Sequence, residues 1–115
     1  MRTSELSAGE LNRILSLLLG RESGTDFEPA NDHACAAALF DREDVGTMPM
    51  AARGRNWCAI AVNRDGDRSE NKGTWQEGPT MLIAGCRATV AKFMGVEFSE
   101  DELLRRARQR PAKRG

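Results

Sequence analysis

Apolar side chains at helical spacing mark the first predicted element of the chain. Near its start they recur at intervals of three and four residues, as Leu11, Ile14, Leu15 and Leu18. This spacing places them on one face of a helix. Ser7 and Glu10 have the S-x-x-E spacing of a capping box, and Gly20 is a common helix end. The pattern therefore predicts a helix over 8–19.

A second, shorter helix is predicted after a polar segment. Residues 21–32 are rich in turn-forming types and predict a loop. Asn31 or Asp32 can then cap a helix over the sequence HACAAALF, which we expect to end near Asp41. The alanines of this helix predict close packing against a neighbouring element.

One strand and a hairpin are predicted in the middle of the chain. Residues 42–55 contain two glycines and a proline, which predicts a loop. The run NWCAIAVN at 56–63 is apolar on both faces, as expected of a covered or central strand. Asp65-Gly66 is a hairpin signal, so we expect a short return strand within residues 67–75.

The most apolar predicted helix spans 80–93, through MLIAGCRATVAKF, and ends at Gly95. The segment Gly78-Pro79-Thr80 is expected to open it, because proline is tolerated in a first turn. Gly85 in its middle predicts the close approach of another backbone. Lys92 is expected to point away from the apolar surface.

A last helix begins at a second capping box, Ser99 and Glu102, and ends before Pro111. A chain of 115 residues is the size of a single domain. We therefore predict one α+β domain over residues 1–104, with three to four helices packed on a small antiparallel sheet. Residues 105–115 form a basic C-terminal tail.

The charge distribution bears on the class of partner. The chain has 17 basic and 17 acidic residues, but residues 105–115 contain six basic and no acidic ones. The body is therefore acidic, which argues against a general nucleic-acid-binding domain. The tail could contact a phosphate backbone or an acidic partner, or could be a solvated helix end.

The leading segment has no signal-peptide stretch, and no apolar run reaches the length of a membrane span. We expect a cytoplasmic protein. Cys35, Cys58 and Cys86 are far apart, and His33 is the only histidine. This spacing does not favour a metal site, so we expect free, buried thiols and no cofactor.

No enzyme motif is present, which favours a non-enzymatic protein. Three features could bind a ligand instead. The helix start at Gly78 and Thr80 offers an anion site, although it could equally be an ordinary cap. Trp57 is expected in the core, whereas Trp75, among polar neighbours, is a candidate for stacking on a base or a partner side chain.

Arginines complete the candidate ligand site. Arg87 lies within an apolar helix, where an arginine usually extends its head to solvent or pairs with a carboxylate; a ligand or interface role is the alternative. Arg53 and Arg55 precede the predicted strand and could form a phosphate cradle with Arg87.

The order of segments resembles the NinX-like proteins, small accessory proteins of tailed bacteriophages and prophages. The resemblance lies in LSAGELNRIL (6–15), FEPANDHACAAALFDRE (27–43), the W-x-A step from Trp57 to Ala59, and GPTMLIAGCRATVAKFMGVEF (78–98). The sequence departs from the family pattern after Asn31-Asp32, where alanines and a cysteine replace an aromatic residue and a proline.

The resemblance implies a protein of phage or prophage origin that works in the cytoplasm of the infected bacterium, and it implies no reaction. We expect an accessory protein that binds and inhibits a component of host antiviral defence. The alternatives are a sponge that sequesters a nucleotide immune signal, in which case a homo-oligomer is expected, and a DNA-associated regulator acting through the tail. The candidate partner-binding residues are Asn31, Asp32, Arg105, Arg106 and Arg108.

Overall fold

The computed structural model describes residues 1–20, 27–50, 56–62 and 75–109. Within these residues the helices and strands are, in chain order, η1 (Thr3–Glu5), α1 (Ala8–Leu19), α2 (His33–Glu43), β1 (Val45–Met50), β2 (Asn56–Ala61), β3 (Trp75–Gly78), α3 (Met81–Met94) and α4 (Glu100–Arg108). The predicted α+β class is confirmed, with four α-helices packed on a three-stranded antiparallel sheet.

The helix starts follow the predicted capping chemistry. Both capping boxes are present, at Ser7 and at Ser99. Asp32, rather than Asn31, caps α2 and accepts the backbone N–H groups of Ala34 and Cys35. This helix runs two residues beyond its predicted end at Asp41, to Glu43.

The sheet has the order β1-β2-β3, with both pairs antiparallel. β2 is the central strand, as the sequence predicts, and ends at Ala61. The prediction of a loop over 42–55 was wrong for 45–50, which form β1. A proline is tolerated there because β1 is an edge strand, where a missing N–H need not break the sheet. β3 begins at the last residue of the range expected for the return strand, and the Asp65-Gly66 turn lies outside the described residues.

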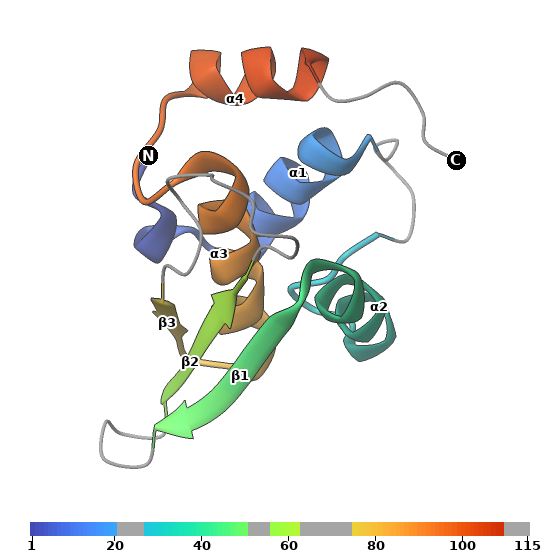
Figure 1. Cartoon of the computed structure of the whole chain (residues 1–115), viewed down its shortest axis with the longest axis vertical. Coiled ribbons are helices and arrows are strands. Elements are labelled where there is room, and N and C mark those ends of the chain that lie inside the picture. Colours follow the sequence, from blue (N-terminus) through green and yellow to red (C-terminus); the bar gives the residue numbers. More distant parts are fainter. Residues whose placement is uncertain (21–26, 51–55, 63–74, 110–115) are drawn as a thin grey trace.

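Small residues let α3 lie close against one face of the sheet. Ala59 and Ala61 of β2 pack against Ala84 and Ala88 of α3, and all four are fully buried. Gly78 continues this contact, because a Cβ at that position would lie 2.7 Å from the backbone nitrogen of Ala84. Figure 1 shows α3 behind the strands, between the sheet and α1.

The main core lies on the other side of α3, away from the sheet. It is built from buried side chains of all four α-helices and the segment before α4: Leu11, Ile14, Leu15, Leu18, Leu39, Cys86, Val90, Phe98 and Leu103. The N-terminus lies beside the α3–α4 connection through an antiparallel bridge between Arg2 and Glu97. None of the described helices is long and apolar enough to cross a membrane.

The close approach predicted at Gly85 is present, but its partner is a side chain and not a backbone. A Cβ on Gly85 would lie 2.1 Å from Cζ of Phe40, whose ring comes from α2. Glycine in the middle of α3 therefore makes room for an aromatic ring that joins two helices.

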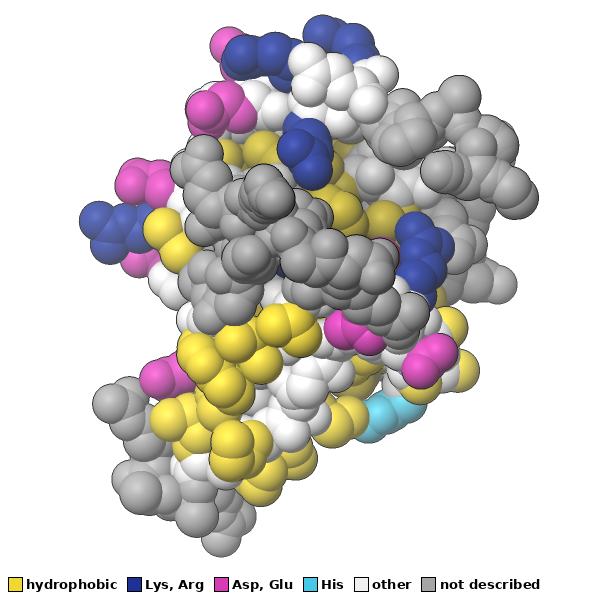
Figure 2. Space-filling model, viewed as in Figure 1, with side chains coloured by type: hydrophobic (Ala, Val, Ile, Leu, Met, Phe, Trp, Pro, Cys, Tyr) yellow, Lys and Arg dark blue, Asp and Glu magenta, His cyan; other side chains and the backbone are white. Residues whose placement is uncertain are grey.

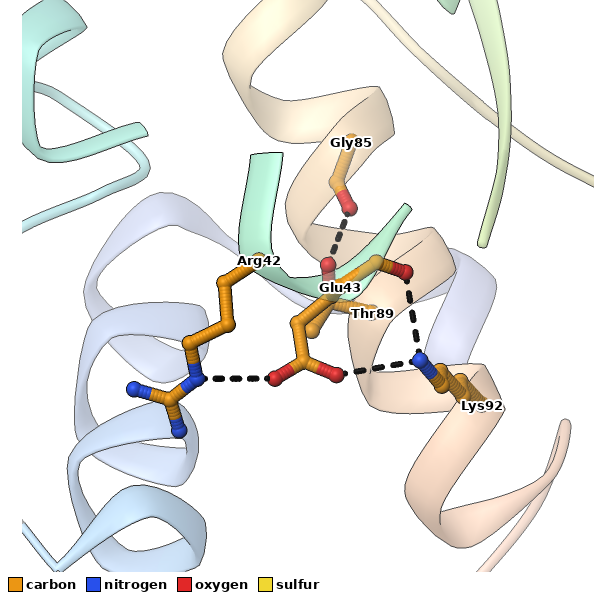
Figure 3. A network of polar contacts seen from close by, with 5 residues as sticks. All are labelled: Arg42, Glu43, Gly85, Thr89 and Lys92. Atoms are coloured by element: carbon orange, nitrogen blue, oxygen red, sulfur yellow. Dashed lines mark hydrogen bonds and ion pairs between the residues drawn. The ribbon is translucent and has the colours of Figure 1, made fainter. Parts of the chain in front are cut away.

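An ion pair joins the end of α2 to α3 (Figure 3). The Lys92 ammonium donates to Oε1 of Glu43 at 3.0 Å and to the Glu43 main-chain oxygen at 3.1 Å. Both side chains are largely buried, with 12% and 10% of their surface exposed. The expectation that Lys92 points away from the apolar surface was wrong, because its ammonium satisfies a carbonyl at the end of α2.

The three cysteines are free, as predicted, but only Cys86 is fully buried. Cys35 and Cys58 are half-buried, which corrects the expectation for them. Cys35 lies in the exposed first turn of α2, and Cys58 lies on the sheet face that points away from α3. Among the described residues no cluster of His, Cys, Asp and Glu could hold a metal ion.

Burial, with a smaller contribution from Cys35, raises the pKa of the Cys86 thiol to about 12. We expect iodoacetamide near pH 8 to alkylate Cys35 and Cys58 in the folded protein and to reach Cys86 only in urea, as read by intact mass. An unfolded cysteine ionises near pH 8.5, whereas Cys86 in the folded protein stays protonated up to about pH 12. Ionisation therefore favours the unfolded chain, and the free energy of unfolding falls as the pH rises from about 9 to 12. Equal alkylation of all three thiols in the folded protein would contradict the burial of Cys86.

Candidate functional site

The face of the sheet opposite α3 carries apolar side chains and is not covered by any described helix. The register pairs Met48 with Cys58 and Ile60 with Trp75 on this face, and it also sets the carboxylate-bearing Glu77 opposite Cys58. Met50 lies two residues beyond Met48 and points the same way. We call these five residues, Met48, Met50, Cys58, Ile60 and Trp75, the open sheet face.

The open sheet face presents large apolar groups to solvent. Met48 and Trp75 are 51% and 53% exposed, on the two edge strands, while Cys58 and Ile60 between them are half-buried. Figure 2 shows hydrophobic side chains gathered over the strands on this side of the molecule. Contiguous exposed apolar surface of this kind marks interaction sites more often than isolated exposed residues do.

Arg87 binds main-chain oxygens. Its Nε and Nη2 donate to the Leu6 carbonyl at 3.1 and 2.9 Å, and its Nη1 donates to the Glu77 carbonyl at 2.8 Å. Burial lowers the pKa of the guanidinium. Within the described part of the chain Arg87 therefore pairs with no carboxylate, and it does not extend freely into solvent. It ties α3 to β3 and to the segment before α1.

A groove of about 540 Å³ runs beside Arg87. Its lining consists of Ser4, Asn56, the five consecutive residues 75–79, and Arg87. The groove brings together three of the predicted ligand residues: Trp75, Gly78 and Arg87. We call it the edge groove, because β3 is an edge strand of the sheet.

The other predicted ligand residues do not join this group. Trp57 is opposite Gly78 on the face that packs against α3, so its side chain points away from that of Trp75. It is partly buried against the alanine cluster, in keeping with the expected core role. Arg53 and Arg55 lie outside the described residues.

The start of α3 differs in detail from the prediction. Gly78 is the last residue of β3, and Thr80 is the N-cap of α3, so Pro79 precedes the helix instead of lying in its first turn. The Thr80 hydroxyl accepts the N–H of Ile83 at 3.1 Å. This side chain caps the helix, which is the ordinary alternative to an anion site.

The predicted partner-binding residues near α2 have structural contacts. Asp32 is the N-cap of α2, and the side-chain oxygen of Asn31 accepts a hydrogen bond of 2.7 Å from Nδ2 of Asn12. Oδ1 of Asn12 in turn accepts the N–H of Ala30. These contacts attach the loop before α2 to α1, and the exposed parts of Asn31 and Asp32 remain accessible.

The arginines of the predicted tail begin within α4. Arg105, Arg106 and Arg108 are exposed, and the first two border a small groove of about 190 Å³ with an apolar floor from Phe93 and Phe98. The last turn of α4 is basic, which suits the negative end of a helix dipole. Residues 110–115 lie outside the described residues.

Gln76 is the groove residue that sequence reasoning missed. It is 6% exposed, and its buried Oε1 has no hydrogen-bond partner among the described residues. The sequence gives no signal for it, because Gln76 lies one residue beyond the range expected for the return strand. Only the register, which sets Gln76 opposite the buried Ala59, shows that this amide is buried.

Comparison of the chain with known protein families and with curated proteins finds no match. The resemblance to NinX-like proteins therefore stays a prediction. The function has to be argued from the open sheet face and the edge groove.

Proposed function

We propose that this chain is a non-catalytic binding protein that docks another protein on the open sheet face. The observation that carries the proposal is the exposure of Met48 and Trp75 on either side of half-buried Cys58 and Ile60. Tryptophan and methionine are enriched in protein–protein interfaces, where the centre of the patch becomes dry on binding. A sheet face offers such a centre with little reorganisation.

The ionisable groups of the described residues also favour binding over catalysis. His33 is exposed at the first residue of α2. Cys86, the buried thiol, has a raised pKa, which is the opposite of what a nucleophile needs. Arg87 already donates to two main-chain oxygens. Together these properties favour a binding role over a catalytic one.

The partner class follows from the resemblance together with this surface. NinX-like proteins would act inside an infected bacterium, so we propose that the partner is a protein component of the host's antiviral defence. Binding that is driven by apolar burial depends weakly on salt, whereas binding by the acidic body would weaken as salt rises. A salt titration of the complex separates these two modes.

The test is a charge placed on the open sheet face. Met48→Glu should fold normally, because the side chain is half exposed on an edge strand. It should weaken partner binding by about 30-fold or more, as expected when docking must bury an unpaired charge. The partner is captured from host lysate with the wild-type chain, and affinities are then measured with purified components.

The matched control is Val96→Glu. Val96 is 57% exposed, close to the 51% of Met48, but lies in the connection between α3 and α4. It should leave affinity unchanged, and in infected cells carrying the defence system it should retain any inhibition that the wild type shows. Equal affinities for the two variants would rule out the open sheet face as the docking surface.

A further inference from the structure

A small groove lies where the end of α3 meets α4, and we call it the α4 groove. Phe93 and Met94, in the last turn of α3, line it with half-buried side chains, and the buried ring of Phe98 lies at its floor. The residues that α4 and its C-cap contribute are Glu102, Arg105, Arg106 and Gln109. These four recur at intervals of three and four positions, so one side of the helix borders the groove.

The α4 groove has the size of one large side chain. Its volume of about 190 Å³ is smaller than the roughly 300 Å³ at which small-molecule pockets begin. Its apolar wall is an aromatic ring beside a thioether, Phe93 and Met94, and both groups pack well against another aromatic ring. Protein interfaces often place a single aromatic anchor in such a pocket. The groove therefore fits a side chain of a partner protein better than a free small molecule.

Three arginines at this end of α4 carry a positive charge that no described residue neutralises. Arg105, Arg106 and Arg108 are exposed, and none of them forms an ion pair with another described residue. The sequence has no acidic residue after Glu102. The helix dipole favours cations here, but it leaves the guanidinium N–H groups available to carboxylates. Figure 2 shows Lys and Arg side chains gathered over this end of the molecule.

The acidic residue in the lining indicates how a ligand would be oriented. Oε1 of Glu102 accepts the backbone N–H of Ser99, so this carboxylate belongs to the capping box at the N-terminal end of α4. Arg105 and Arg106 lie about one helical turn further along. Negative charge on a ligand is therefore favoured at the C-terminal end of the groove, and an apolar group is favoured next to α3.

This combination favours an acidic peptide over a nucleic acid. A phosphate backbone would pair with the arginines but would leave the apolar wall of the groove unfilled. A nucleic acid would also extend beyond the groove over the body of the chain, where residues 1–104 include 17 acidic but only 11 basic ones. Like charges repel there. A peptide that combines an aromatic side chain with carboxylates matches both parts of the groove.

We propose that the α4 groove binds an acidic segment of a partner protein through one aromatic anchor. The anchor packs against Phe93 and Met94, and the carboxylates that flank it accept hydrogen bonds from Arg105 and Arg106. α4 and β1 lie at opposite ends of the molecule (Figure 1), so this is a second interface, distinct from the open sheet face. It does not depend on the docking proposed there.

The experiment titrates the full chain with an unlabelled peptide in which aspartates and glutamates flank one phenylalanine. We expect NMR chemical shifts of the protein to show binding that is about tenfold tighter than that of the same peptide with serine in place of phenylalanine. An oligothymidylate of equal net charge should bind more weakly than the phenylalanine peptide. No binding of that peptide at millimolar concentration, equal binding of the two peptides, or tighter binding of the oligothymidylate overturns the proposal.

Two double variants remove the same charge from different places. Arg105→Gln with Arg106→Gln should weaken binding of the phenylalanine peptide about tenfold, because both guanidinium groups that border the groove are lost. Arg2→Gln with Arg108→Gln is the matched control. Both of these arginines are exposed and lie outside the groove lining, so affinity should change by less than about twofold.

Circular dichroism checks that both double variants keep the fold, as expected for changes at exposed positions. Equal losses of affinity in the two variants would show that binding follows net charge alone, and would overturn the α4 groove as the site.

Discussion

Lys92→Met should lower the free energy of unfolding by about 3 kcal/mol, the usual cost of removing one partner of a largely buried ion pair. Methionine keeps the apolar stem of the side chain but leaves the Glu43 carboxylate, only 10% exposed, without its 3.0 Å contact. The main-chain oxygen of Glu43 loses its donor as well. Urea unfolding followed by circular dichroism measures the loss.

Two further variants show whether an unpaired buried charge or a general packing defect causes the loss of stability. Lys92→Met combined with Glu43→Leu should recover most of the stability, because no unpaired charge remains. Arg42→Met should cost less than about 1 kcal/mol, since Arg42 is 56% exposed where it meets Glu43. A double variant as unstable as Lys92→Met alone would show that the pair is not what joins α2 to α3.

Local sequence signals predicted the helices well because their chemistry lies within a few residues. The capping boxes at Ser7 and Ser99 each need only a residue three positions away, and both formed. Asp32 capped its helix in the same way. Lys92 was misplaced because its partner, Glu43, is 49 residues away. The prediction that Lys92 points away from the apolar surface followed from its own helix alone.

The sheet shows most clearly which features cannot be predicted from residues that are close in the sequence. β1 contains Gly46 and Pro49, which are loop signals, yet it forms because β2 supplies a partner along its whole length. Without β1 the open sheet face could not be predicted, since Met48 had no strand to lie on. The edge groove likewise needed the register that buries Gln76. Trp75 and Arg87 were identified from their chemistry, but their proximity was not predictable.

Gly85→Ala should destabilise the protein by about 2 kcal/mol, although alanine is the better helix former by about 1 kcal/mol. The added Cβ would lie 2.1, 2.5 and 2.8 Å from three atoms of the Phe40 ring, all far below contact distance. The ring must therefore leave its place between α2 and α3, and its packing is lost. Thermal and urea unfolding of the purified variant measure the effect.

Two further variants isolate the contact with Phe40. In a Phe40→Leu background the same change at Gly85 should be neutral or stabilising, because the shorter side chain leaves room for the methyl group and the helix gains propensity. Gly9→Ala is the matched helical control. A Cβ on Gly9, in the first turn of α1, meets nothing within 4 Å, so this variant should gain stability. If Gly85→Ala is as stabilising as Gly9→Ala, the ring of Phe40 does not occupy the space above Gly85, and α2 meets α3 in another way.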